Sequence, residues 1–395
     1  MKKLTAIVLA FLMVLSVFSA CGKEESKKPV TITVLVESSS SISNGFNETL
    51  RETLKLEKGI SLEFVTVDSG PNTNRQSREQ ELQYIRAQVM AGKGPDIYVL
   101  PTSLASRHEA VFIDLNETIE NGLFLTLDEY IADSEVINIE DYIPSVLDAG
   151  KTKEGQQVIP LLYTVPAMFT DRENADALMT VNEVFQTGDA NLLSDINRIL
   201  SDSETGIWLF PQVADYSKFE LAITEEDILS TFDKISSIGS SGAYIESQIF
   251  DENLLYDCRD KSLVLLKNNE GGITAKATAF AAIDRNCEHP EEAFEVLEMI
   301  CGYASHGQKS LRPDPSLYGA SEGLATLAGY LKETDLVDTE MLSFIENNVT
   351  IVSFNSNLDE VLYRSLIGYN PKDPSFDKEK YISDLYTELK MHLAE

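Results

Sequence analysis

The chain has 395 residues with 64 acidic and 32 basic side chains, and its formal net charge is −32. Such an acidic surface disfavours binding to nucleic acid and to anionic membranes, and it favours solubility outside the cell. The length is enough for two lobes with separate cores. The charge gives no information about a ligand, because a pocket can differ from the field around it.

The N-terminus has the pattern of a targeting segment. Two lysines precede an apolar run over residues 4–18, and Ser-Ala-Cys follows, ending at Cys21. A charged start, an apolar stretch and small residues before a cleavage site are typical of a secretory signal. A cysteine directly after small residues resembles a bacterial lipobox, in which the thiol is lipidated. We expect a lipoprotein signal peptide over residues 1–20 and a lipidated Cys21 with a polar tether over 21–29; an uncleaved membrane anchor or an ordinary secretory signal is the alternative.

The next part of the chain alternates strand-like and helical patterns. Strands are predicted over residues 30–36, 62–67 and 97–100, with helices at about 47–56 and before Gly92. This alternation implies a parallel sheet with right-handed crossovers. Ligands of such sheets lie beyond the carboxyl ends of the strands, so the residues after the first and third strands are expected at the rim of a cleft.

The helix before the third strand has both a start and a stop signal. Leu82, Ile85 and Val89 recur on one helical face. Ser77 and Gln80 have capping-box spacing, which predicts the helix start there. Gly92 is the type of residue that ends a helix in a left-handed conformation.

The remaining elements are predicted from local patterns in the same way. Short helical pieces, a strand-like run and capped or amphipathic helices are expected at residues 112–115, 127–131, 139–149, 155–163, 180–183, 192–200 and 228–238. A strand at 271–283 precedes a turn and a helix that begins at Pro290. The last helices are predicted at 357–368 and 376–393.

Four motifs along this order resemble one protein family. Residues 91–98, A-G-K-G-P-D-I-Y, are similar to the A-G-x-x-P-D-hydrophobic signature of extracellular solute-binding proteins of bacterial ABC importers, in particular family 1, whose members mostly take up sugars. The segment over residues 155–163 resembles the family's G-x-x-x-x-x-P crossing segment. Thr180 to Glu183 resembles its T-x-x-E helix start, and residues 282–293 resemble its A-I-x-x-x-x-x-x-P-E-x-A return.

The resemblance implies an α/β fold of two lobes, the periplasmic-binding-protein-like fold of type II. Each lobe would be a mostly parallel sheet flanked by helices, with a cleft between the lobes. The implied segments are an N-terminal lobe over residues 30–155, a C-terminal lobe over 156–270, a return to the N-terminal lobe over 271–335 and C-terminal lobe helices over 336–395.

Candidate ligand contacts follow from the chemistry of sugars, whose apolar faces fit aromatic rings and whose hydroxyls fit carboxylates and amides. The candidates at strand ends and crossings are Glu37, Ser38, Thr102, Tyr163, Trp208 and Asn269. As alternatives, Glu37 is a solvated loop acid, and Tyr163 and Trp208 are core residues. A single Trp beside 15 Tyr is unusual for an oligosaccharide receptor, so a peptide or another polar solute stays open.

The sequence offers no pattern for catalysis or for a metal. The nucleophile-elbow, H-E-x-x-H and phosphate-loop motifs are absent, and acidic pairs are too abundant to be informative. The four His have no ligand spacing. We therefore expect no catalytic residue, metal or cofactor. Cys301 is expected as a buried thiol on the face of Phe294 and Leu297, and a bridge to Cys287 stays open.

The resemblance implies that the protein captures a small polar solute through hinge closure and delivers it to an ABC permease. The family implies a sugar or oligosaccharide as this solute. The protein would be a monomer at the extracytoplasmic face of the cell membrane, which it would contact only through the lipid on Cys21. A surface-tethered hydrolase, a peptide-binding protein and a signalling receptor are the alternatives.

Overall fold

The computed structural model describes a set of residue ranges between residues 29 and 394. The described residues are 29–38, 52, 54–56, 58–68, 74–102, 110–134, 137, 143–165, 167–171, 177–189, 192–193, 196, 210, 212–238, 261–268, 270–305 and 339–394. The predicted signal peptide and Cys21 lie outside them. No helix in these ranges is long and apolar enough to cross a bilayer.

The first lobe is built on a six-stranded mixed sheet. β1 runs parallel to β2 and β3, as the strand–helix alternation predicts. β12 runs antiparallel to β3 and β6 and parallel to β13, which makes the sheet mixed. The strands are β1 (Val30–Ser38), β2 (Ile60–Asp68), β3 (Ile97–Pro101), β6 (Val158–Thr164), β12 (Ile273–Ile283) and β13 (Val349–Phe354).

Helices cover both faces of this sheet because its strands are apolar on both sides. On β12, Ala281 and Ile283 pack into the core that also holds Phe294 and Leu297, whereas Phe280 and Ala282 pack into the opposite core. The helices of this lobe are α3 (Arg75–Met90), α4 (Leu115–Glu120), α5 (Asp128–Asp133), α6 (Pro144–Asp148) and α11 (Pro290–Ser305). The short strands β4 (Lys151–Thr152) and β5 (Gly155–Gln156) form a hairpin beside α6.

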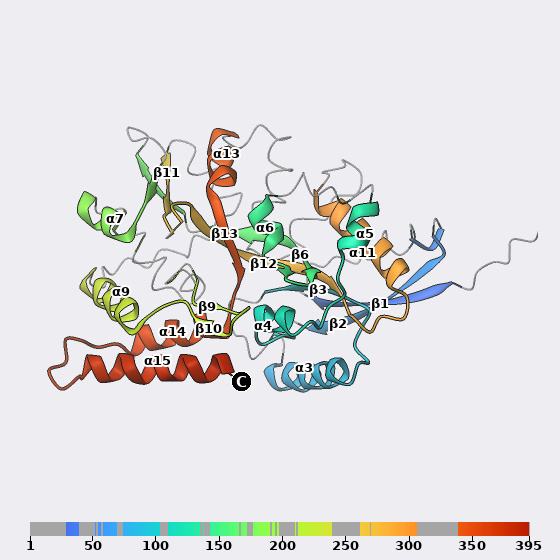
Figure 1. Ribbon diagram of the computed structural model, residues 1–395, viewed down its shortest axis with the longest axis horizontal. Coiled ribbons are helices and arrows are strands. Elements are labelled where there is room, and N and C mark those ends of the chain that lie inside the picture. Colours follow the sequence, from blue (N-terminus) through green and yellow to red (C-terminus); the bar gives the residue numbers. More distant parts are fainter. Residues whose placement is uncertain are drawn as a thin grey trace, which may run out of the picture.

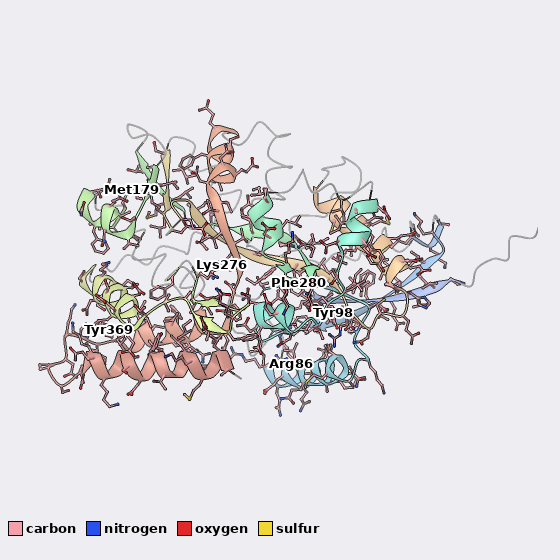
Figure 2. All side chains as sticks on the ribbon, viewed as in Figure 1. Arg86, Tyr98, Met179, Lys276, Phe280 and Tyr369 are labelled. Atoms are coloured by element: carbon pink, nitrogen blue, oxygen red, sulfur yellow. The ribbon has the colours of Figure 1, made fainter. Side chains whose placement is uncertain are left out.

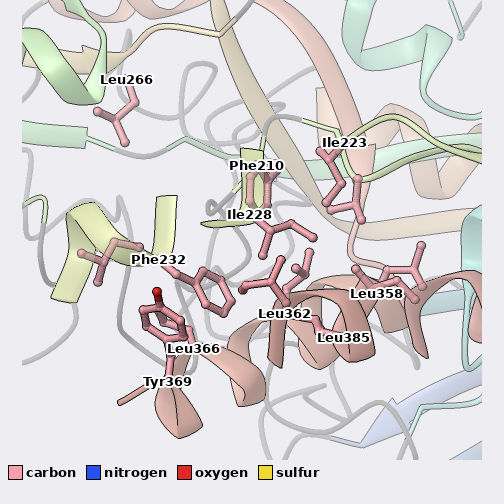
Figure 3. Close-up of a cluster of buried hydrophobic side chains, with 14 of the residues drawn as sticks. Phe210, Ile223, Ile228, Phe232, Leu266, Leu358, Leu362, Leu366, Tyr369 and Leu385 are labelled. Carbon is pink, nitrogen blue, oxygen red and sulfur yellow. The ribbon is translucent and has the colours of Figure 1, made fainter. Parts of the chain in front are cut away.

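The second lobe has a smaller sheet and a separate core. Its sheet has the order β7 (Ala167–Asp171), β11 (Lys261–Leu266), β8 (Ala177–Met179). The core packs Phe232 of α9 against Leu362 of α14 and Leu385 of α15, as Figure 3 shows. The other elements are α7 (Val181–Thr187), β9 (Ala214–Asp215), β10 (Glu220–Leu221), α9 (Glu225–Ile238), α14 (Asn357–Gly368) and α15 (Lys378–Ala394). A further helix, α13 (Thr339–Asn348), leads directly into β13 of the first sheet.

The described elements mark three places where the chain passes between the two lobes. β6 of the first sheet leads to β7 of the second, and β11 of the second leads back to β12 of the first. β13 of the first sheet then leads to α14, whose Leu358 belongs to the second core. Figure 1 shows the two groups of elements at opposite ends of the molecule, with β12 and β13 between them. The predicted lobe boundaries stay proposals.

Several local predictions are confirmed at the level of single residues. Thr180 and Glu183 form a complete capping box at the start of α7, and Pro290 is the first residue of α11. Gly92 has a left-handed φ of +68° just after α3. The predicted start of α3 is wrong: Asn74 caps it by accepting from the backbone amides of Gln76 and Ser77, so the helix begins earlier, at Arg75.

Both described cysteines are free thiols, and neither forms the bridge that the sequence left open. Cys301 is 1% exposed, which confirms the predicted buried thiol. Burial raises the pKa of Cys301 to about 12 and is also the main cause that raises the pKa of Cys287 to about 12.

We predict that Cys301 resists alkylation in the folded protein. With a pKa of about 12, roughly one thiol in ten thousand is a thiolate at pH 8, and the thiolate is the reactive form. Iodoacetamide treatment followed by peptide mass mapping should label Cys301 only after denaturation. Half-buried Cys287 is the control, because its raised pKa slows its labelling while its partial exposure still permits it. Rapid labelling of native Cys301 would contradict the buried placement.

Candidate functional site

A polar cavity of about 200 Å³ lies where β13 ends and α14 begins, and both lobes line it. From the first lobe come α4, the end of α6 and residues of β12 and β13; from the second come the β9 region and the first turn of α14. Most lining side chains carry hydrogen-bonding groups: Asn116, Glu120, Asp148, Lys151, Gln212, Asp215, Tyr216, Ser217, Lys276, Ser353, Ser356 and Asp359. Such a lining suits a polar ligand held by many hydrogen bonds.

A buried ion pair links the lobes at the wall of this cavity. Lys276 of β12 and Asp359 of α14 are 2% and 3% exposed, and Lys276 Nζ lies 3.3 Å from Asp359 Oδ2. Figure 2 labels Lys276 near the middle of the molecule, beside β13. Asp359 is held in place by a reciprocal capping box with Ser356 at the start of α14. Burying two charges is costly unless they are paired and hydrogen-bonded, so the fold fixes both of them.

Asp114 makes a second polar connection between the lobes. Its Oδ1 caps α4 by accepting from the amides of Asn116 and Glu117. Its Oδ2 accepts from the Tyr216 hydroxyl at 2.8 Å and from the Asn357 amide at 3.1 Å, both beside the second core. One carboxylate of the first lobe therefore holds the β9–β10 connection and the N-terminus of α14.

Three side chains in the cavity wall have shifted pKa values: Tyr216, Glu120 and Asp215. Burial, and next the charge of Asp114, raises the pKa of Tyr216 well above its ordinary value. The phenol therefore stays protonated and donates at neutral pH. Burial also raises the pKa of Glu120, and the acids Asp215 and Glu154 add to this while Lys153 opposes it. Asp215 has a lowered pKa, first because of its hydrogen bond with Lys218.

None of the described candidates from the sequence is among the residues lining the cavity. Glu37 is 5% exposed and accepts from Arg78 of α3 at 3.0 Å, so it ties β1 to a helix. Thr102 is 9% exposed and its hydroxyl donates to the Ala277 carbonyl at 2.5 Å. Thr102 does border a smaller hollow at the end of β3, with Asn355.

The other candidates are placed less completely. Tyr163 lies in β6 and is fully buried. Its hydroxyl has no hydrogen-bond partner within the described part of the chain, and burial raises its pKa. This position agrees with the core alternative for Tyr163. Ser38 ends β1, but its side chain lies outside the described residues, as do Trp208 and Asn269. A ligand contact by any of the six candidates stays a prediction.

The motif at residues 91–98 acts as architecture for the first sheet. Asp96 accepts from the amide and the hydroxyl of Thr33 at 2.8 and 2.7 Å, which ties the start of β3 to β1. The Tyr98 hydroxyl donates to Asp284 at 2.6 Å, which ties β3 to the end of β12. These contacts lie within the first lobe, and they fix the position of β3 between β1 and β12.

The residues that line the cavity were not foreseen from the sequence. The charge of Lys276 was a usable signal, because it is the one charged residue in the strand I-T-A-K-A-T-A-F-A-A-I and a charge in a buried strand needs a partner. The strand β13, which supplies Ser353, was not predicted, although its sequence V-T-I-V-S-F is rich in β-branched residues. Within the described ranges, no group of three or more His, Cys, Asp or Glu residues could hold a metal ion.

Comparison with solved structures identifies the fold. An extracellular solute-binding protein of family 1 from Alicyclobacillus acidocaldarius matches with a TM-score of 0.57 and 16% identity, over 93% of this chain and all of that one. An ABC substrate-binding protein from Listeria monocytogenes in complex with cycloalternan matches with a TM-score of 0.52 and 12% identity, over 92% and 99% of the chains. A periplasmic oligogalacturonide-binding protein from Yersinia enterocolitica matches with a TM-score of 0.54 and 13% identity, over 92% and 99%.

Two de novo designed esterases also match, with TM-scores of 0.56. No family model matches the sequence, and no curated protein matches it. Most of the matched structures named above are binding proteins, and the likeness establishes the two-lobed α/β fold of solute-binding proteins for this chain. The resemblance predicted from the four motifs is confirmed at the level of the fold.

Proposed function

We propose that this chain is the binding component of an ABC importer, which captures a sugar or oligosaccharide between its two lobes. The observation that carries the proposal is the polar cavity of about 200 Å³ that residues of both lobes line. Its carboxylates, amides and hydroxyls match the hydroxyl groups of a carbohydrate. Proteins of the same fold that bind cycloalternan and oligogalacturonide support this ligand class.

The mechanism is hinge closure around the ligand, with no bond made or broken. The described elements include three chain crossings between the lobes, and a few residues at such crossings can absorb the rotation between two rigid bodies. A ligand that contacts both walls binds the closed arrangement more tightly and shifts the population toward it. The closed form is then the one presented to the permease.

The cellular placement in this proposal rests on the N-terminal sequence. Signal cleavage before Cys21 and lipidation of its thiol would tether the protein at the extracytoplasmic face of the membrane. One acyl chain binds a membrane only marginally, whereas a multi-chain anchor holds stably. The protein would work as a monomer beside its permease.

Ligand-induced stabilisation tests the proposal directly. A ligand that binds only the folded protein raises its stability by RT ln(1 + [L]/Kd), about 2.7 kcal/mol at a hundred times Kd. We expect thermal unfolding to shift upward with a saccharide from a panel of maltose, cycloalternan and oligogalacturonides, and not with tripeptides. Shifts with peptides alone would reject the carbohydrate class. Release of product from a saccharide or an ester would reject the binding role in favour of the hydrolase.

A further inference from the structure

The ammonium group of Lys276 has unused hydrogen-bonding capacity although it is almost completely buried. Its side chain is 2% exposed and borders the interlobe cavity. An ammonium has three N–H donors. Among the described residues, the one acceptor of Lys276 Nζ is Asp359 Oδ2, at the long distance of 3.3 Å. Two donor positions of a buried charge are therefore left for something in the cavity.

Asp359 has a free acceptor beside this ammonium. Its Oδ2 accepts from the amide and the hydroxyl of Ser356, at 2.8 and 2.9 Å, in addition to Lys276. Its Oδ1 accepts no hydrogen bond from any described residue. Asp359 is 3% exposed and also borders the cavity, so the pair offers one open acceptor next to two open donors.

Ser353 adds a third group to this cluster. It is the register partner of Lys276 across the parallel pair β12–β13, so the two side chains leave the sheet on the same face. Its Oγ is buried and has no hydrogen-bond partner among the residues that the structure describes. Buried polar atoms without partners are rare in native proteins because each carries an uncompensated desolvation cost. Three neighbouring groups with open positions at one cavity wall indicate a missing partner rather than three separate defects.

The charges in the cavity wall around Lys276 and Asp359 determine which chemical group of a ligand can bind there. Asp359 already neutralises Lys276, so the pair presents donors and an acceptor without a net charge. Around them the cavity wall carries three acids, Glu120, Asp148 and Asp215, and one base, Lys151, so negative charge is in excess. An anionic group would meet these carboxylates, and a cationic group would compete with Lys276 for Asp359. A neutral hydroxyl pair can accept from Lys276 and donate to Asp359 at the same time.

We propose that Lys276, Asp359 and Ser353 form the anchoring subsite of the cavity, where they bind a pair of neutral hydroxyl groups of the ligand. This inference rests on the proposed function and sharpens it to neutral saccharides, with uronic acids and amino sugars excluded at this position. Lys276 and Ser353 are specificity-determining residues in this arrangement, and the capping box at Ser356 positions Asp359.

Calorimetric titration of the purified protein with maltose, digalacturonate and chitosan disaccharide tests the inference. We expect binding of maltose alone, and Lys276→Met should weaken it about tenfold to a hundredfold, the value of a hydrogen bond to a charged group. Ser353→Ala should also weaken binding, while the unfolding midpoint without ligand stays unchanged because Oγ has no partner to lose. Lys380→Met is the matched control, because this lysine is exposed, pairs with Asp384 on α15 and is not among the residues that line the cavity, so it should change affinity less than about threefold.

The outcomes separate the two proposals. Failure of these three saccharides and of cycloalternan to bind would overturn the proposed function and the subsite with it. Maltose binding that Lys276→Met leaves intact, or tighter binding of digalacturonate or of the amino sugar than of maltose, would overturn the subsite alone. A clear loss of stability in unliganded Ser353→Ala would show that Oγ has a structural partner, which also overturns the subsite.

Discussion

Replacing Gly150 with alanine is expected to lower the free energy of unfolding by about 3 kcal/mol or more, because the new methyl group would collide with the main chain. A Cβ at Gly150 would lie 1.8 Å from the carbonyl oxygen of Val158 and 2.7 Å from its carbonyl carbon. Side chains can rotate away from such a conflict, but here the neighbour is the backbone of β6. The same glycine carbonyl accepts from the amides of Gln157 and Val158 at 2.9 and 3.1 Å, so a shift of either segment also breaks hydrogen bonds.

Urea denaturation followed by circular dichroism measures this effect. Gly188→Ala is the matched control: Gly188 has a left-handed φ of +67°, but no atom lies within 4 Å of its new Cβ. Its cost is backbone strain alone, about 1–2 kcal/mol. A Gly150→Ala variant as stable as Gly188→Ala would contradict the close approach of β6 to the end of α6.

Replacing Asp114 with alanine should lower the free energy of unfolding by about 2–5 kcal/mol and also loosen the contact between the lobes. The variant loses the N-cap of α4, worth about 0.5–2 kcal/mol, and a hydrogen bond from Tyr216 to a charged group, worth about 1.5–3 kcal/mol. The first loss is local to one lobe, whereas the second acts between lobes. Small-angle X-ray scattering of the unliganded protein should therefore show a larger radius of gyration.

A pair of tyrosine variants separates these two effects. Tyr216→Phe removes the donor to Asp114 across the lobes, and Tyr369→Phe removes the donor to Asp233 within the second lobe, at 2.5 Å. The chemical change is the same, a phenol lost from a carboxylate. Both variants should lose stability, but Tyr216→Phe alone should increase the radius of gyration. If the radius of gyration increases equally in both variants, or increases in neither, Asp114 does not hold the lobes together.

Local patterns predicted those parts of the fold whose causes lie within a few residues. The capping box at Thr180 and Glu183, the proline that begins α11 and the glycine that ends α3 each act on their own helix end. The prediction for the start of α3 was wrong for an equally local reason. Asn74 and Ser77 are both suitable capping residues, and the Asn74 side chain accepts from the first amides one turn before Ser77.

The site could not be predicted in this way, because its chemistry depends on partners far along the chain. Glu37 lies at the end of β1, which is a suitable position for a ligand contact. Its carboxylate, however, accepts a hydrogen bond from Arg78, which is 41 residues further along the chain. Lys276 and Asp359 are separated by 83 residues and belong to different lobes. The sequence shows that a charged residue is unusual at each of these two positions. Only the structure shows that β12 and α14 bring the two side chains into contact.

The order in which the lobes take their elements from the chain has a consequence for biosynthesis. The first sheet needs β13, at residues 349–354, and the core of the second lobe draws on residues from Met168 to Leu393. Domains of most proteins fold one after another as they leave the ribosome, N-terminal first. Here a nascent chain that stops before β13 lacks a strand of one sheet and both helices α14 and α15 of the other core. Neither lobe can complete its folding before the C-terminal residues are synthesised, so the polypeptide keeps apolar surface exposed until its last helix is made.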